Sequence, residues 1–263
     1  MNLDRKQLEQ LVISVAKTEL LPRFNDVVRH YKTDGSIVTE ADHIVQKKLL
    51  DAFKSLCPET VLLGEEMTTE QQQNLFNSGQ PLWCLDPVDG TSNFAAGIPY
   101  FSVSLALIDQ GEITFGIVYD PIHDECFSAQ KGQGAWLNGQ KMVLTNSNFH
   151  LKQSTAFIDF KRLSTSLAIR LVNDLPYASQ RSLGSIALEL CWLAAGRGHI
   201  YLHAKQHLWD YAAAQLILLE AGGIARTFED EPIFTGSLSP RSTIAAVDQS
   251  LFNQWQRYLN NDL

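Results

Sequence analysis

Two acidic residues, Asp86 and Asp89, follow an apolar run in the stretch PLWCLDPVDGTSNF, residues 81–94. The run 82–85 is typical of a buried strand, so Asp86 is predicted to leave the core at the edge of a sheet. Two neighbouring carboxylates at such an edge can bind a hard cation, because Mg²⁺ prefers oxygen ligands. Asp-Pro and Asp-Gly pairs also begin ordinary turns, so these two residues alone leave a turn and a metal site equally open.

The residues after these acids favour a phosphate ligand. Gly90 and Thr91 stand where a helix can begin, so their backbone N–H groups are available to an anion. Mg²⁺ is usually held by a few carboxylates together with a substrate phosphate. The stretch as a whole therefore fits a site for phosphate esters.

Three other places in the chain carry acids in similar settings, and each has a simpler explanation. Glu65 and Glu66 end the apolar stretch VLLG, where a solvated strand end would explain them. Asp210 stands at the start of an amphipathic helix, where an acid complements the helix dipole. Asp42 can close a capping box with Thr39 in the segment TEAD. These explanations suffice for each acid alone and explain the joint pattern poorly.

The elements that must position these acids differ between the two halves of the chain. Up to about residue 148 the pattern predicts helices and an antiparallel sheet, including a hairpin over 101–121 that turns at 109–111. Beyond that point strands and helices alternate, which is typical of an α/β structure. We therefore expect an N-terminal α+β half, 1–148, and a C-terminal α/β half, 149–263, with no flexible linker between them.

Individual elements follow from apolar spacing and from Gly and Pro positions. Helices are predicted over 5–30 with a disturbance at Pro22, after Thr39, over 161–173, 184–196 and 209–221, and at the C-terminus. Strands are predicted over 61–66, 82–85, 125–140 in short pieces, 154–158, 199–203 and 242–248, with a turn at 33–36.

Composition limits the class of protein. The chain has 263 residues, 45% of them hydrophobic, which suits one large domain or two closely packed smaller ones. It has no apolar run long enough to span a membrane, and its first residues, MNLDRKQLEQ, do not resemble a signal peptide. Four widely spaced cysteines (Cys57, Cys84, Cys126, Cys191) indicate a reduced, cytoplasmic protein without structural zinc.

The charge of the chain is acidic, with a formal net value of -8 and no cluster of Lys and Arg along the sequence. This argues against nucleic-acid binding through a basic face, although a patch assembled by folding stays open. Several carboxylates that converge on one site cannot all stay ionised without cations.

Four motifs then occur in one order between residues 32 and 223: SIVTEAD, LLGEE, WCLDPVDGTSNF and LWDYAAAQLILLEAGG. The third resembles the signature W-x-x-D-P-[IV]-D-G-T-x-N-F of the inositol monophosphatase family, and the others resemble its V-T-x-x-D, G-E-E and W-D-x-A-A…E-A-G-G segments. The resemblance implies a layered αβαβα sandwich of the inositol monophosphatase and fructose-1,6-bisphosphatase type. It also implies Mg²⁺-dependent, Li⁺-sensitive hydrolysis of small phosphate monoesters.

The resemblance also implies roles for individual residues. Two to three Mg²⁺ ions per site would be held by Glu65, Asp86, the Val88 carbonyl, Asp89 and Asp210, with Asp86 bridging two of them. Gly90 and Thr91 would bind the phosphate. Glu65, Thr91 and Asp42 would act in catalysis, the last two by polarising the attacking water.

Substrate identity stays open at this point. Inositol monophosphate is the first expectation, and relatives with the same metal residues act on fructose 1,6-bisphosphate, 3′-phosphoadenosine 5′-phosphate or histidinol phosphate. His203 stands on the expected substrate rim, where inositol-type relatives usually carry a Glu that reaches ring hydroxyls, so a broader phosphatase is expected. A regulatory role through protein binding is the alternative from another class. Relatives are often homodimers.

Overall fold

The computed structural model describes residues 4–24, 30–31, 37–146 and 148–260. The turn predicted at 33–36 lies outside the described residues. The helices are α1 (Arg5–Val15), α2 (Glu40–Leu56), α3 (Thr69–Phe76), α4 (Thr91–Ala96), α5 (Thr165–Asn173), α6 (Ile186–Ala194), α7 (Leu208–Glu220) and α8 (Gln249–Asn260).

Two large sheets lie between these helices. The seven-stranded sheet contains, in spatial order, β3 (Val61–Gly64), β4 (Leu82–Asp89), β5 (Ser102–Asp109), β6 (Glu112–Asp120), β7 (Glu125–Gln130), β8 (Gly134–Leu137) and β9 (Gln140–Met142). The five-stranded sheet contains β11 (Ser179–Arg181), β10 (Thr155–Ile158), β12 (Ile200–Gln206), β14 (Arg241–Ala246) and β13 (Ile224–Arg226). A small sheet pairs β1 (His30–Tyr31) with β2 (Ile37–Val38).

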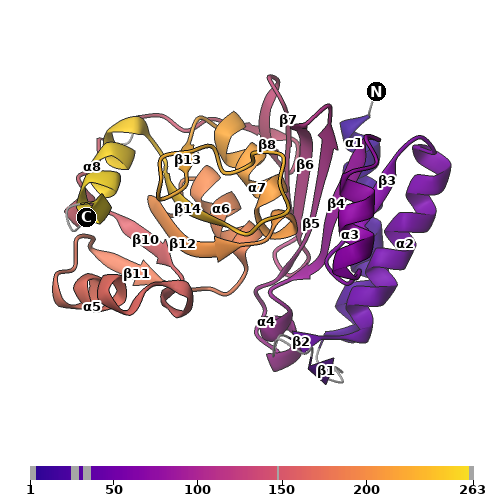
Figure 1. Cartoon of the computed structure of the whole chain (residues 1–263), viewed down its shortest axis with the longest axis horizontal. Coiled ribbons are helices and arrows are strands. Elements are labelled where there is room, and N and C mark those ends of the chain that lie inside the picture. Colours follow the sequence, from indigo (N-terminus) through magenta and orange to yellow (C-terminus); the bar gives the residue numbers. More distant parts are fainter. Residues whose placement is uncertain (1–3, 25–29, 32–36, 147, 261–263) are drawn as a thin grey trace.

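The layers alternate across the molecule. Helices α1 and α2 cover one face of the seven-stranded sheet, α3 packs against its edge strand β3, and α6 and α7 lie between the two sheets (Figure 1). Helices α5 and α8 lie beyond the five-stranded sheet. This is the expected αβαβα sandwich.

Strand β4 shows why the sandwich forms. All eight of its residues are buried, and its side chains alternate between the two cores. Trp83 and Leu85 pack with α1 and α2, whereas Leu82 and Cys84 join the core beneath α6 and α7. A strand covered on both faces needs a continuous apolar run, which explains the sequence 82–85.

Helix α7 belongs to the second half of the chain and packs on the first half's sheet. It contacts β5, β6 and β7. A Cβ atom at Gly116 would lie 2.8 Å from the Ala213 carbonyl oxygen, so glycine there lets the helix approach the sheet closely. The two halves therefore share the core beneath α6 and α7, and the division at 148/149 stays a prediction.

Several predicted elements need correction. The first helix ends at Val15 and continues as a π-helical turn, Ala16–Leu20, and a 3-10 turn, Leu21–Arg23, that includes Pro22. The helix expected over 161–173 begins only at Thr165, because Ser164 caps it. Helix α3 and the short strands β11 and β13 were not predicted, since each is too short to show a clear apolar period.

Candidate active site

The acids singled out in the sequence meet in one cleft, which we call the acidic cleft. Its volume is about 180 Å³, and it is lined by Ile37, Glu65, Asp86, Val88, Asp89, Gly90, Thr91, Ser92, Gly184 and Asp210. These residues come from β2, the ends of β3 and β4, the start of α4, the loop before α6 and the start of α7. Folding thus brings together segments as far apart in the sequence as Ile37 and Asp210.

A β-bulge places Asp86 and Asp89 on the same side. Strand side chains alternate, so residues three apart would normally face opposite ways. The pairing of β4 with β5 shifts between these two positions, where Asp86 pairs with Ser104 and Asp89 with Ser102. The extra residue of the bulge restores a common direction and accommodates Pro87 within a strand. The strand therefore continues through the segment that could have been a simple turn.

Asp89 lies at the N-terminus of α6. Its carboxylate accepts hydrogen bonds from the backbone N–H groups of Ile186 (3.2 Å) and Ala187 (2.8 Å) and from the hydroxyl of Ser185. These donors are oriented by the helix and complement a negative charge. The contact ties the first half of the chain to the second at the cleft.

Asp86 and Asp210 are each held by one backbone donor. Asp86 Oδ1 accepts from the Val88 N–H at 3.0 Å. Asp210 Oδ2 accepts from the His207 N–H at 2.8 Å and so closes a capping box at the start of α7. Asp210 therefore caps the helix, as expected from the sequence, and also lines the cleft.

Asp42 is fully buried beside the cleft at the start of α2. Its Oδ2 accepts from the backbone N–H and from the hydroxyl of Thr39, both at 2.7 Å, which is the expected capping box. Its Oδ1 has no hydrogen-bond partner among the described residues. The Thr91 hydroxyl donates to the Val88 carbonyl at 2.8 Å.

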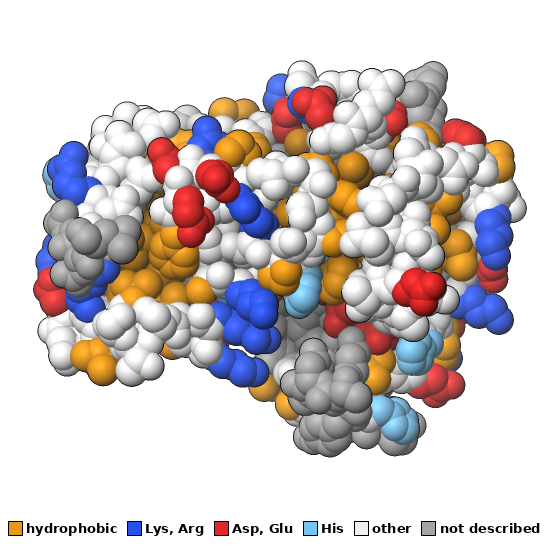
Figure 2. Space-filling model, in the orientation of Figure 1, with side chains coloured by type: hydrophobic (Ala, Val, Ile, Leu, Met, Phe, Trp, Pro, Cys, Tyr) orange, Lys and Arg blue, Asp and Glu red, His pale blue; other side chains and the backbone are white. Residues whose placement is uncertain are grey.

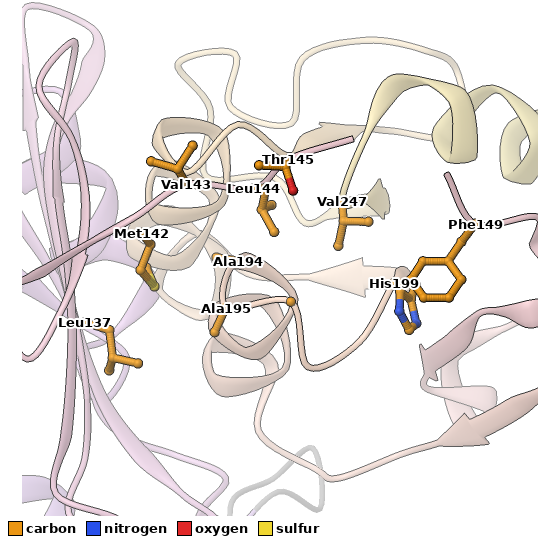
Figure 3. A pocket seen from close by; sticks show the side chains of 11 residues that line it. Leu137, Met142, Val143, Leu144, Thr145, Phe149, Ala194, Ala195, His199 and Val247 are labelled. Carbon is orange, nitrogen blue, oxygen red and sulfur yellow. The ribbon is translucent and has the colours of Figure 1, made fainter. Parts of the chain in front are cut away.

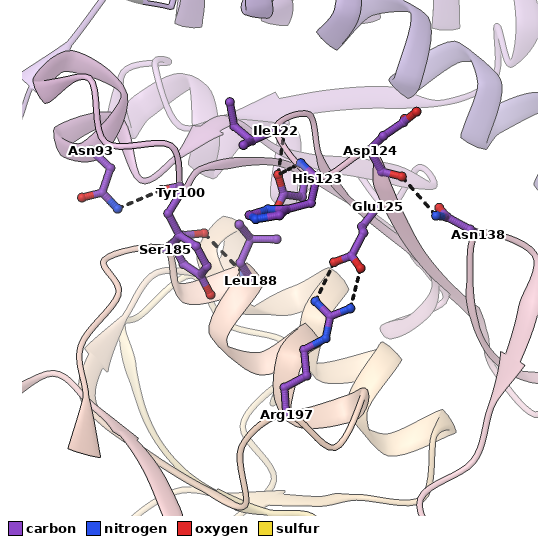
Figure 4. Close-up of polar contacts among 11 residues, drawn as sticks. Asn93, Tyr100, Ile122, His123, Asp124, Glu125, Asn138, Ser185, Leu188 and Arg197 are labelled. Atoms are coloured by element: carbon purple, nitrogen blue, oxygen red, sulfur yellow. Dashed lines mark hydrogen bonds and ion pairs between the residues drawn. The ribbon is translucent and has the colours of Figure 1, made fainter. Parts of the chain in front are cut away.

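Glycine at position 90 is required by the backbone. Gly90 caps α4 with φ +94°, in the left-handed region. A Cβ atom there would lie 3.1 Å from the Gly184 carbonyl oxygen and 3.2 Å from that of Tyr100. Asn93 holds the same two segments, donating to the carbonyls of Tyr100 (2.8 Å, Figure 4) and Leu183 (2.7 Å).

Burial and mutual repulsion disturb the acids of the cleft. The pKa values of Asp86 and Asp210 are well above the ordinary value. Burial has the largest effect, and the negative charges of Glu65 and Asp89 have the next largest. Burial also raises the pKa of Asp89 to about 6, against the lowering effect of its α6 hydrogen bonds. Burial likewise raises the pKa of Asp42 to about 7. Such a group of carboxylates lacks compensating positive charge.

The donor set fits a divalent cation, although no preformed coordination shell is present. Among the described residues, no three Asp, Glu, His or Cys side chains are arranged so that they could hold a metal ion. Asp86, Asp89 and Asp210 instead accept hydrogen bonds from backbone donors. Four carboxylates and a backbone carbonyl around one small cleft are hard oxygen donors of the kind that Mg²⁺ selects.

Comparison with known proteins decides the family. The model of the inositol monophosphatase family matches residues 4–258. The chain belongs to this family. Inositol monophosphatase 1 of Bos taurus is 30% identical over 244 residues, which cover 90% of this chain and 86% of that protein. Nus factor SuhB of Pasteurella multocida is 32% identical over 250 residues, with 91% and 90% covered.

Solved structures agree with the family assignment. The Thermotoga maritima IMPase has a TM-score of 0.82 at 27% identity and covers 98% of this chain and 100% of its own. The extragenic suppressor protein SuhB of Bartonella henselae has a TM-score of 0.84 at 26% identity, with 98% of each chain covered. The fold class and the enzyme class expected from sequence are thereby confirmed. This inositol monophosphatase family member is a metal-dependent phosphatase that hydrolyses phosphomonoesters.

His203 does not line the acidic cleft of this family member. Its side chain is buried at 3% exposure, its Nε2 lies 3.1 Å from Asp159 Oδ2, and its Nδ1 accepts from the Lys205 N–H at 3.2 Å. The acid that contacts His203 is Asp159, which was not singled out from the sequence. The apolar run before Asp159 is the signal that could have identified it as an acid leaving a strand.

Two further residues near the cleft were also missed. Ser185 caps α6 and donates to Asp89. Glu189 is buried in the same helix and accepts from the N–H groups of Leu183 (2.5 Å) and Gly184 (3.2 Å), which shapes the loop at the cleft. A Ser before a helical run does predict a cap, but nothing in the sequence indicated a partner 96 residues away.

A larger pocket lies apart from these acids. It has a volume of about 410 Å³ and is lined mainly by apolar residues such as Met142, Leu144 and Val247, with His199 beside Phe149 at one end (Figure 3). It contains no carboxylate, and the His199 Nδ1 already accepts from the Thr155 N–H at 2.9 Å. The acidic cleft is therefore the site with the means for phosphate chemistry.

Proposed function

We propose that this protein hydrolyses small phosphate monoesters at the acidic cleft with Mg²⁺, and that inositol monophosphate is among its substrates. The observation that carries the proposal is the convergence of Glu65, Asp86, Asp89 and Asp210 beside the start of α4. Family relatives named inositol monophosphatase support the substrate.

The proposed metal ligands fall into two overlapping groups. Glu65, Asp86 and the Val88 carbonyl would hold one Mg²⁺, and Asp86, Asp89 and Asp210 a second. A third, weaker ion would depend on Glu65. The raised pKa values of Asp86 and Asp210 support this assignment, because a cation would stabilise both ionised carboxylates.

The chain's own groups would orient the substrate and the water. Gly90 and Thr91 offer backbone N–H groups at the first turn of α4, where such groups have no partner within the helix. The Asp42 Oδ1, buried without a partner among the described residues, can accept a hydrogen bond from the attacking water. When bound, Mg²⁺ would supply Lewis acidity toward the phosphoryl group and lower the pKa of that water.

Thr91 has a related part in this proposal. Its hydroxyl donates to the Val88 carbonyl, which leaves the hydroxyl oxygen able to accept a hydrogen bond from the same water. Thr91 and Asp42 would then polarise the water from two sides, with Glu65 as the third catalytic group. The attack requires no Ser, Cys or His nucleophile.

A phosphate-release screen tests the proposal. Inositol 1-phosphate, fructose 1,6-bisphosphate, 3′-phosphoadenosine 5′-phosphate and histidinol phosphate would be compared with and without Mg²⁺, and after addition of a chelator. We expect release that requires Mg²⁺ and returns when the ion is restored. Undiminished turnover in excess chelator would exclude the metal mechanism.

Lithium provides an independent check. A small monovalent cation could occupy the second site without stabilising the departing oxygen, so millimolar Li⁺ should inhibit at saturating Mg²⁺. A staphylococcal inositol monophosphatase soaked in LiCl is described as an inhibitory complex, and it shares this fold at 22% identity. Full activity in the presence of Li⁺ would argue against this part of the proposal.

A second candidate function is binding to a protein partner. The relative named Nus factor SuhB, 32% identical to this chain, favours it. The tagged protein and its Asp86→Asn variant would each be purified from the protein's own cells. A partner that binds the fold itself should be retained by both forms, whereas one that depends on the active site should be lost from the variant.

No helix among the described residues is long and apolar enough to cross a membrane. A homodimer and a cytoplasmic location are further parts of the proposal.

A further inference from the structure

Folding gathers positive charge that the sequence spreads over 45 residues. Strands β10, β11 and β12 run parallel, so their carboxyl ends meet at one edge of the five-stranded sheet. Each end carries exposed cations: Lys161 and Arg162 after β10, Arg181 at the end of β11 and Lys205 near the end of β12. We call these four residues the cationic rim.

The cationic rim borders the acidic cleft through the chain itself. Arg181 precedes by three residues Gly184, which lines the cleft, and Lys205 precedes Asp210 by five. Arg162 ends the 3-10 turn Phe160–Arg162 that follows β10, and this turn contacts β12, the strand that leads to Asp210. Its positive charge also acts on Asp159 and Asp210, although burial raises the pKa of Asp210 overall. Figure 2 shows Lys and Arg side chains gathered at the lower centre of the molecule, between its two halves.

The cations of the rim differ from most others on this acidic protein. Elsewhere Lys17, Lys131 and Arg197 each form an ion pair with a carboxylate; the Arg197 pair with Glu125 is drawn in Figure 4. In the described part of the chain, no ion pair involves Lys161, Arg162, Arg181 or Lys205. Unpaired cations clustered beside a phosphate site are available to an anionic ligand.

A buried pair fixes the base of the rim. Asp159 lies between β10 and the rim, and its Oδ1 accepts from the Lys161 N–H at 2.9 Å. Its Oδ2 lies against the buried His203. With both oxygens engaged, Asp159 holds the turn that carries Lys161 and Arg162 in one conformation.

We propose that the cationic rim is a subsite for a second phosphate group on the substrate. The proposal rests on the proposed function, because the first phosphate must occupy the acidic cleft. It names the substrate class as phosphate monoesters whose leaving group carries another phosphate. Arg162 is the main specificity-determining residue, since it is exposed on the turn after β10, the strand that lies between β11 and β12.

Matched substrates test this directly. Inositol 1-phosphate and inositol 1,4-bisphosphate differ by one phosphate, and so do fructose 1-phosphate and fructose 1,6-bisphosphate. We expect kcat/KM of the wild type to be higher for the bisphosphate in at least one pair. Arg162→Gln should lower that preference about five- to tenfold, mainly through KM, and leave the monophosphate within about twofold.

The control is another exposed arginine. Arg257 lies on α8 at the far end of the molecule, so Arg257→Gln removes the same charge without touching the rim. The preference for the bisphosphate should also fall with ionic strength in the wild type and less so in Arg162→Gln.

The outcomes separate the two proposals. Equal kcat/KM for both members of each pair, or equal effects of Arg162→Gln and Arg257→Gln, would overturn the rim subsite while leaving the phosphatase intact. Absence of any hydrolysis would instead overturn the proposed function. In that case calorimetric binding of inositol 1,4-bisphosphate tests the rim alone: unchanged affinity in Arg162→Gln would reject it, and weakened affinity would support it.

Discussion

The acidic cleft and the cationic rim are neighbours built in opposite ways. The acids Asp86, Asp89 and Asp210 take hydrogen bonds from backbone donors that the fold holds in place. The cations Arg162 and Lys205 are exposed and form no ion pair among the described residues. The acids proposed to act in catalysis are thus buried and fixed, which costs electrostatic energy. The cations proposed to select the substrate can stay solvated until the ligand binds.

The largest expected effect comes from neutralising the centre of the cleft. Asp86→Asn should lower kcat roughly a thousandfold or more, because a shared metal ligand loses its charge with little change in shape. Without Mg²⁺ the same variant should melt at a higher temperature than the wild type, since it removes a buried charge from among like charges.

Activity assays and melting curves in chelator check both halves of this prediction. Asp51→Asn is the control, because Asp51 is an exposed acid on α2 that pairs with Lys54. It should leave both measurements unchanged. An active Asp86→Asn, or one less stable than the wild type in chelator, contradicts the description of the cleft.

A smaller effect is expected where the backbone shapes the cleft. Gly90→Ala should destabilise the protein by about 1–3 kcal/mol, because alanine at φ +94° is strained. It should also lower activity, since the new Cβ would push on the carbonyls of Gly184 and Tyr100. Gly139→Ala is the matched control: its φ is +77° and nothing lies within 4 Å of the added Cβ. Equal losses of activity in both variants would show that close packing at Gly90 has no role.

Glu189 tests the electrostatics of the loop between cleft and rim. Burial raises its pKa from 4.5 to about 8, against the lowering effect of the Leu183 and Gly184 N–H groups. The folded state then retains a proton that the unfolded state releases. The contribution of Glu189 to stability is therefore present below pH 4.5 and is lost as pH rises toward 8.

The variant Glu189→Gln keeps the shape and does not ionise. Its free energy of unfolding should fall less steeply than that of the wild type between pH 5 and 8, by up to about 1.4 kcal/mol per pH unit. Denaturant titrations at several pH values measure this difference. Parallel curves for the two proteins would mean that Glu189 is already ionised in the folded state.

The sequence carried more information about the cleft than about the rim. Asp86, Asp89 and Asp210 follow apolar segments and stand in local motifs, so each could be found without knowing the fold. The bulge that turns Asp86 and Asp89 to one side depends on pairing with β5, which no local pattern encodes. The rim cations lie on three separate strand ends, and only the parallel order β11-β10-β12 brings them together.

The same contrast explains the short elements that were missed. Helix α2 has enough turns to show its apolar period. Helix α7 was expected to be amphipathic, but it is buried on nearly all sides between the two sheets, and its long apolar run made it recognisable. Strands β11 and β13 have three residues each and exist because a neighbouring strand is there to pair with them. Pairing with neighbouring strands, and not the local sequence, determines whether such short segments form strands.

The smallest expected effect concerns His203, which links the rim to the core. A Glu at this position was expected to reach substrate hydroxyls, but here the side chain at 203 faces Asp159 and not the acidic cleft. His203→Glu should therefore place two carboxylates together and destabilise the protein, without raising kcat/KM for inositol 1-phosphate relative to a bisphosphate. His203→Gln retains a side-chain N–H donor for Asp159 and should be close to the wild type in stability.

For His203→Gln we expect only a two- to threefold change in the ratio of kcat/KM between bisphosphate and monophosphate, because the rim keeps its charges and loses part of its support. Asp159→Asn provides the comparison: it should change the ratio in the same direction, since it weakens the same contact from the other side. If His203→Glu instead turned the enzyme toward inositol 1-phosphate while remaining as stable as the wild type, the side chain at 203 would have to reach the substrate. The contact with Asp159 would then not determine where the side chain at position 203 points.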